Sequence, residues 1–123
     1  GVYIQVAENT YKKVKDQFEW RNLDYVQVKG KNVPVKVYEL LAEKGKLKEN
    51  DVELVKKYEE GLTFYNKQEW DKALKKFEQS KELEDMFPTR PTSPSHMYIM
   101  RCNHLKENPP GADWNGVWKL TAK

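Results

Sequence analysis

Side chains that commonly bind metals or act as nucleophiles are few in this sequence, and their spacing is uninformative. The one cysteine, Cys102, lies between His96 and His104, which are eight residues apart. Thiolate and imidazole groups bind zinc, but no Cys/His cluster here has the spacing of a zinc site. We therefore expect ordinary core or surface histidines and no metal. A lone cysteine cannot form an intramolecular disulfide, and this favours a reducing, cytoplasmic setting.

The acidic residues give no better support for catalysis. They fall in charged stretches with helical patterning, where a solvated helix face is the simplest interpretation. The pairs are Asp51 and Glu53, Glu59 and Glu60, and Glu84 and Asp85. The sequence also lacks a G-x-S-x-G nucleophile elbow and a phosphate-binding Walker loop. We expect no catalytic residue in this chain.

Composition bounds the remaining function classes. A chain of 123 residues is long enough for one small domain with an appendage. Hydrophobic residues make up 38% and charged residues 33%, so we expect a modest core that depends on the Trp, Tyr and Phe side chains. The net charge of +3 is nearly balanced and argues against a nucleic-acid partner. No stretch approaches the roughly 18 consecutive apolar residues of a membrane span.

Residues 1–41 predict the order strand, helix, strand, strand. Alternation over 2–6 indicates a strand, and apolar residues at helical spacing over 11–18 indicate a short helix. Segments 23–28 and 34–41 return to strand character around turn-forming residues, which predicts an antiparallel hairpin. So few elements, with strands apolar on both faces in places, are near the lower limit for an independent domain. We therefore expect a truncated domain.

Residues 43–49 form a charged, glycine-containing connector, after which the patterns become helical. A first helix is expected to follow, with Asn50 or Asp51 as its cap. A turn at 66–68 leads into a second helix over 69–84. The two helices should pack as a short antiparallel hairpin.

A third helix and a docked tail are expected to complete the chain. Ser93 and Pro94 have the types of an N-cap and a first-turn residue for a helix over 95–106. Two tryptophans, Trp114 and Trp118, lie close together near the end of the sequence. Such bulky apolar residues predict a tail that packs against the protein.

The two-helix segment has the spacing of a tetratricopeptide repeat. Small and aromatic residues stand at offsets 8, 11, 17, 20, 24 and 27 of a 34-residue unit, namely Gly61, Phe64, Trp70, Ala73, Phe77 and Ser80. Only one repeat is visible, although about three are normally needed for a free-standing array. The segment is therefore either a module that binds a protein partner along Tyr58, Phe64 and Trp70, or an ordinary helical hairpin.

Three segments of the first part resemble the C-terminal end of the catalytic domain of class III adenylate/guanylate cyclases. They are the strand I-Q-V-A-E-N-T, the stretch L-D-Y-V-Q-V-K-G-K and the stretch P-V-K-V-Y-E-L. The family has a strand of the type I-x-[IV]-S-x-x-T followed by a V-K-G-[KR]-x-x-P-V-x-[VI]-Y hairpin, and Ala7 replaces the usual serine. Residues 42–123 also resemble the helical extension that follows this domain in many bacterial cyclases with a membrane-embedded sensor.

The resemblance implies a division of labour between this chain and a longer protein. The family's two metal-binding aspartates, its transition-state Asn and Arg and its base-selecting residues all precede the matched segments. Lys29 corresponds to the lysine that reaches toward the nucleotide phosphates, with Lys31 as a less certain companion and Lys36 at the surface. The longer protein would be a homodimer that uses two Mg²⁺ or Mn²⁺ ions to cyclise ATP, or alternatively GTP.

We therefore expect an α+β fold in two parts. Residues 1–42 would be the remnant of a cyclase domain, completed by the rest of that domain, and residues 43–123 a tetratricopeptide-like extension. The longer protein would make cyclic AMP on the cytoplasmic side of a membrane anchor, and this chain alone would be inactive. The alternative is a helical module with no catalytic role that binds a protein partner or stabilises a dimer.

Overall fold

The computed structural model describes residues 4–27, 33–85 and 93–119. Within them, four helices and four strands form an α+β fold, as the sequence predicts. The chain divides into a helical unit, Lys48–Trp114, and a sheet unit made of the chain up to Leu47 and from Asn115 on. The sequence predicts parts over 1–42 and 43–123, whereas the first compact unit of the structure runs to Leu47 and also includes the residues from Asn115 on.

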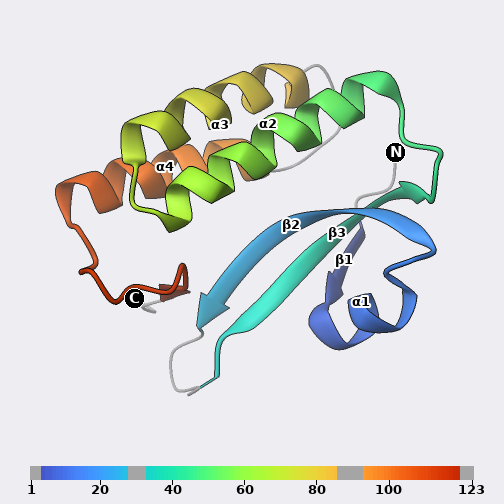
Figure 1. The fold of residues 1–123 in the computed structure, drawn as a ribbon, viewed down its shortest axis with the longest axis horizontal. Helices are drawn as coiled ribbons and strands as arrows, with labels where there is room; N and C mark the ends of the chain where they lie inside the picture. Colours follow the sequence, from blue (N-terminus) through green and yellow to red (C-terminus); the bar gives the residue numbers. More distant parts are fainter. Residues whose placement is uncertain (1–3, 28–32, 86–92, 120–123) are drawn as a thin grey trace. The chain divides into compact units, whose positions relative to one another are not determined.

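The sheet unit contains β1 (Ile4–Ala7), α1 (Glu8–Val14), β2 (Phe18–Gln27), β3 (Val35–Glu43) and β4 (Trp118–Lys119). Its strand order is β1-β3-β2-β4, with β1 and β2 both antiparallel to β3 (Figure 1). This confirms the predicted strand, helix, strand, strand order and the hairpin. The short β4 runs parallel to the end of β2 and was not expected from the sequence.

The short helix expected around Tyr11 and Val14 is present, but Phe18, which the helical spacing groups with them, does not lie on it. α1 begins at Glu8 and ends at Val14, where a turn closes with a 3.0 Å bond from the Gln17 amide to the Val14 carbonyl. Phe18 instead begins β2 and meets Trp20 edge to face, with ring centroids 6.0 Å apart. Aromatic side chains pack well on a pleated strand, so this contact outweighs the helical spacing of Phe18.

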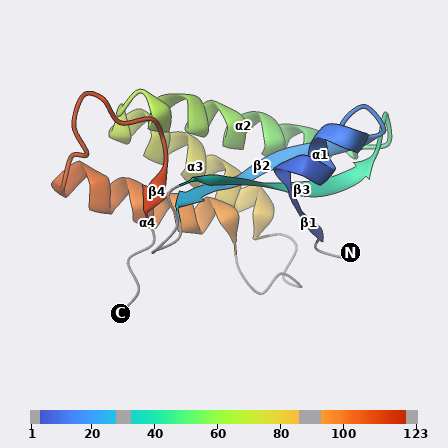
Figure 2. The same cartoon turned by 90° about the horizontal axis from the view of Figure 1, so that it is seen from below.

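α1 lies beside the strands of the sheet (Figure 2), and aromatic stacking holds it there. The ring of Tyr11 stacks on Tyr38 of β3, with centroids 3.7 Å apart, and meets the edge of Trp20 of β2 at 5.1 Å. The indole nitrogen of Trp20 also donates to the Lys15 carbonyl at 3.1 Å. One tyrosine therefore ties the short helix to both strands of the hairpin.

The helical unit contains α2 (Glu49–Asn66), α3 (Trp70–Glu84) and α4 (Pro94–Glu107). α2 and α3 lie side by side as a hairpin, and the turn expected at 66–68 is confirmed (Figure 1). Gln68 adopts a positive φ of 61° in this turn. The predicted cap of α2 is wrong, since the helix begins two residues before Asp51 and its cap position, Lys48, makes no side-chain cap bond.

The small residues picked out by spacing lie where α2 and α3 approach most closely. Ala73, Phe77 and Ser80 of α3 are completely buried, and Gly61 of α2 is also buried. A β-carbon added at Gly61 would lie 2.7 Å from Cε1 of Phe77. The helix separation at this level is therefore one that only glycine permits.

α4 completes an aromatic core inside the helical unit. Tyr98 stacks on Phe77 at 5.1 Å and meets Tyr58 and Tyr65 of α2 edge to face at 5.7 and 5.1 Å. At its start, the Ser93 side chain accepts a bond from the His96 amide at 3.2 Å, and Pro94 occupies the first turn. The predicted N-cap pair is confirmed.

The tail also docks as predicted, with Trp114 on the helical unit. Its ring lies 5.1 Å from that of Tyr65 and 5.6 Å from that of Trp70. None of the helices in the described part of the chain has the length and apolar character needed to cross a bilayer.

The close approach at Gly61 leads to a first prediction, that Gly61→Ala destabilises the protein. Alanine normally stabilises a helix by about 1 kcal/mol relative to glycine. Here its methyl group would overlap the ring of Phe77, and overpacking of a core typically costs about 1–3 kcal/mol. The free energy of unfolding, measured by urea titration with circular dichroism, should therefore fall.

The matched control is the same substitution in a Phe77→Leu background, where the ring that blocks the methyl group is gone. There Gly61→Ala should cost much less than in the wild-type chain. Equal costs in the two backgrounds would show that the Phe77 ring does not impose the glycine.

Candidate functional site

The lysines that carry the phosphate prediction, Lys29 and Lys31, lie outside the described residues. Around them the structure describes β2 up to Gln27 and β3 from Val35. Lys36 is exposed, as expected, and its ammonium lies 5.2 Å from the centre of the Tyr25 ring. The structure therefore describes the two strands of the hairpin that precede and follow Lys29 in sequence, β2 and β3.

The predicted interaction surface along Tyr58, Phe64 and Trp70 requires correction. Tyr58 is 0% exposed and Trp70 is 9% exposed, because α4 covers the first and Trp114 packs on the second. Phe64 is half-buried, with the ammonium of Lys72 5.7 Å from its ring centre. A partner therefore cannot contact the three rings together while the helical unit is folded.

The candidate metal-ligating residues are not brought together. His96 and His104 are exposed, whereas Cys102 is completely buried. Burial raises the pKa of the Cys102 thiol to about 12. Among the described residues, no group of three or more His, Cys, Asp and Glu side chains is placed to hold a metal ion.

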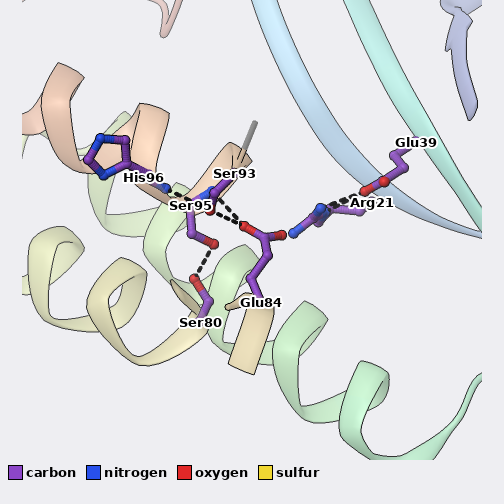
Figure 3. Close-up of polar contacts among 7 residues, drawn as sticks. All are labelled: Arg21, Glu39, Ser80, Glu84, Ser93, Ser95 and His96. Carbon is purple, nitrogen blue, oxygen red and sulfur yellow. Dashed lines mark hydrogen bonds and ion pairs between the residues drawn. The ribbon is translucent and has the colours of Figure 1, made fainter. Parts of the chain in front are cut away.

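A buried carboxylate that the sequence analysis assigned to a solvated face organises the junction of α3 and α4. Glu84 is 3% exposed, and its Oε1 accepts bonds from the Ser93 hydroxyl at 2.6 Å and the Ser95 amide at 3.0 Å (Figure 3). The Ser95 hydroxyl in turn lies 2.7 Å from that of Ser80. The expectation of a solvated Glu84 is therefore wrong.

The negative charge of Glu84 stabilises the N-terminal end of α4. The amide of Ser95 is one of the first in that helix, where a carboxylate satisfies an otherwise unpaired donor and meets the positive end of the helix dipole. A signal for this role was present in the sequence. Ala73, Phe77, Ser80 and Glu84 follow one another by four, three and four residues, and such spacing places all four on the buried face of α3.

The sheet unit holds a buried charge pair that no sequence pattern singled out. Arg21 of β2 stands directly opposite Glu39 of β3, and both side chains are 1% exposed. Two guanidinium nitrogens of Arg21, Nε and Nη2, donate to Glu39 Oε1 at 2.9 and 2.6 Å (Figure 3). Arginine suits such a pair because its planar group keeps its charge and offers several donors.

Both clusters bond to the protein's own backbone and side chains. The observed bonds are those of an ion pair between two strands and of a carboxylate at the start of a helix. Comparisons with protein-family models, with curated proteins and with solved structures find no match for the chain.

The raised pKa of Cys102 predicts a slow thiol. The ordinary thiol pKa of 9.0 rises to about 12 in the folded protein, so below about pH 9 the folded chain holds about a thousandfold less thiolate than the unfolded chain. Iodoacetamide at pH 8.5 should label the native protein far more slowly than the urea-unfolded protein. Cys102→Ala supplies the unlabelled control, and equal rates in the two states would contradict burial of the thiol.

The sign of the associated pH dependence is fixed by the same shift. Above about pH 9 the unfolded chain releases the thiol proton while the folded chain retains it. The contribution of Cys102 to stability should therefore fall as the pH rises from about 9 to about 12.

The Glu84 junction predicts an unusual ranking of capping residues at Ser93. Ser93→Ala should lower the free energy of unfolding by about 1 kcal/mol, whereas Ser93→Asn should preserve it. Aspartate normally caps as well as asparagine, but Ser93→Asp would set a second carboxylate beside Glu84 and should cost about 1 kcal/mol or more. Thermal and urea unfolding would measure the series.

The control for this ranking is Glu84→Gln, which removes the charge and keeps the size of the side chain. In that background the aspartate and asparagine variants should have similar stability. A persistent difference would mean that the repulsion does not come from Glu84.

Proposed function

We propose that this chain is the C-terminal end of a class III nucleotide cyclase catalytic domain followed by a helical extension. The longer protein, a homodimer, converts ATP, or alternatively GTP, to the cyclic 3′,5′-nucleotide and pyrophosphate. The helical extension follows the catalytic domain on the cytoplasmic side of the membrane. The chain by itself has no cyclase activity.

The observation that carries the proposal is that two segments of the resemblance, L-D-Y-V-Q over 23–27 and V-K-V-Y over 35–38, lie on the two antiparallel strands β2 and β3. The three segments that resemble the family contribute to three adjacent strands. β1 pairs with β3 at Ile4 and Leu40, and β3 pairs with β2 at Tyr25 and Lys36. The strand, helix, hairpin order agrees with the order of the family motif.

In this proposal the chain contributes binding rather than bond-making. Lys29 supplies a compact positive charge on a flexible stem, which is suited to the terminal phosphates of a nucleotide. Residues of the longer protein hold the two Mg²⁺ or Mn²⁺ ions that position the triphosphate and activate the 3′-hydroxyl. Within the described residues no side-chain group is arranged to hold these ions.

The proposal predicts a binding defect for Lys29→Ala in the longer protein. Loss of one charged contact to phosphate is worth about 1.5–3 kcal/mol, so KM for ATP should rise by at least about tenfold. The matched control is Lys36→Ala, which removes an exposed lysine from the same hairpin. A cyclase assay with varied ATP concentration measures both variants.

Two results would overturn the proposal. One is a longer protein that lacks two aspartates at metal-site spacing and a downstream Asn and Arg. The other is formation of cyclic nucleotide by the 123-residue chain alone, since the proposal assigns the chemistry to residues that precede it.

A further inference from the structure

The chain carries one Asn-Gly pair, Asn115-Gly116, in the segment that leads into β4. An asparagine side chain can lose ammonia when the main-chain nitrogen of the next residue attacks its carbonyl carbon, Cγ. Glycine favours this reaction because no β-carbon hinders its nitrogen and its backbone reaches conformations closed to other residues. Asn115 is the only one of the eight asparagines in the sequence that is followed by glycine.

Most of the other asparagines are held in regular structure or lack a suitable nitrogen. Asn9 lies in α1, Asn22 in β2, Asn50 and Asn66 in α2, and Asn103 in α4. In a helix or strand the fixed backbone dihedrals keep the next nitrogen from turning toward Cγ. Asn108 precedes a proline, whose nitrogen carries no proton, and Asn32 lies outside the described residues. Within the described chain, Asn115 alone combines a glycine neighbour with irregular backbone.

The local structure of Asn115 brings the reacting groups together. The residue is exposed, and its Oδ1 accepts a 3.2 Å bond from the Val117 amide. The ring closed by this bond contains both Cγ of Asn115 and the nitrogen of Gly116, so the two atoms are held near each other. A donor on Oδ1 also stabilises the negative charge that develops on this oxygen during the attack. Gly116 has a φ of 90°, which glycine adopts without strain.

We propose that Asn115 is a site of spontaneous deamidation in the folded protein. The Gly116 nitrogen gives its proton to solvent and forms a bond to Cγ. The bond from Cγ to the side-chain nitrogen breaks, and this nitrogen takes a proton from solvent and leaves as ammonia. One water molecule then opens the resulting five-membered imide. Opening at Cγ gives aspartate, and opening at the main-chain carbonyl gives isoaspartate, in which the chain runs through the former side chain.

The two products differ in how they fit the turn. Aspartate keeps an oxygen acceptor at the position from which Asn115 bonds the Val117 amide. In isoaspartate the same carbonyl becomes part of the main chain, which is longer by one carbon atom before Gly116. Val117 is 6% exposed and Trp118 pairs with Val26, so a close-packed neighbourhood resists the extra atom. We therefore expect aspartate to keep the turn and isoaspartate to open it.

The test is incubation of the folded 123-residue chain at pH 8.5, followed by ion-exchange chromatography and mass spectrometry of its tryptic peptides. Each event adds one negative charge and raises the mass by one unit. We expect modification at Asn115 to be at least about tenfold faster than at any other asparagine. The matched control is Asn115→Gln, which would have to close a less favourable six-membered ring and should stay unmodified at this position.

A urea-unfolded sample shows whether the fold permits the reaction. The unfolded chain keeps the Asn-Gly pair and should also be modified at Asn115. If Asn115 reacts in the unfolded sample but is unchanged in the folded chain over the same time, the fold blocks the attack and the proposal is wrong. Faster modification of another asparagine in the folded chain would also overturn it.

Amide hydrogen exchange at Val117, followed by NMR, distinguishes the two products. Asn115→Asp supplies the aspartate form directly, and its Val117 amide should exchange at the wild-type rate. The isoaspartate form, isolated by chromatography, should exchange faster there, while the amides of residues 37–40 in β3 serve as internal controls. Equal exchange at Val117 in the two forms would contradict the role given to the turn. No nucleotide enters these measurements, so they are independent of the cyclase assays.

Discussion

The contact between Gly61 and the ring of Phe77 is the constraint on which the helical unit depends. It sets the separation of α2 and α3. The same Phe77 ring also stacks on Tyr98 of α4. The Phe77 ring therefore limits how closely α3 can approach both α2 and α4. The polar residues Ser80 and Glu84 follow Phe77 on the buried face of α3, so their bonds to α4 are aligned by the same packing.

In each unit a buried charge fixes how two neighbouring elements pack. In the sheet, a slip of one residue between β2 and β3 would move Arg21 and Glu39 out of register and leave each buried charge without this partner. In the helical unit, Glu84 lies at the C-terminal end of its own helix, where a negative charge is unfavourable, and gains from the N-terminus of α4. α3 and α4 thus stabilise each other's ends.

Sequence patterns were most informative where a local rule decides the structure. The hairpin, the turn at 66–68 and the Ser93-Pro94 start of α4 follow from short-range chemistry, and all three are observed. Long-range contacts decide the features that were missed. Phe18 lies in a strand, where it pairs with Glu43 of β3, and Tyr58 and Trp70 are covered by residues far along the chain. The spacing of Glu84 indicated the buried face of α3, but its charge favoured the prediction of a solvent-exposed side chain.

The parallel pairing of β4 with β2 has a consequence for the order of folding. It joins Val26 to Trp118, which lies 92 positions later in the sequence, whereas the contacts of α2 with α3 are close in sequence. Closing so long a loop is slow relative to forming local contacts. During synthesis, β2 leaves the ribosome before the helices do, and it can pair with β4 only after the helices have been synthesised. The sheet therefore begins to form first and is completed last, and the helical unit folds in between.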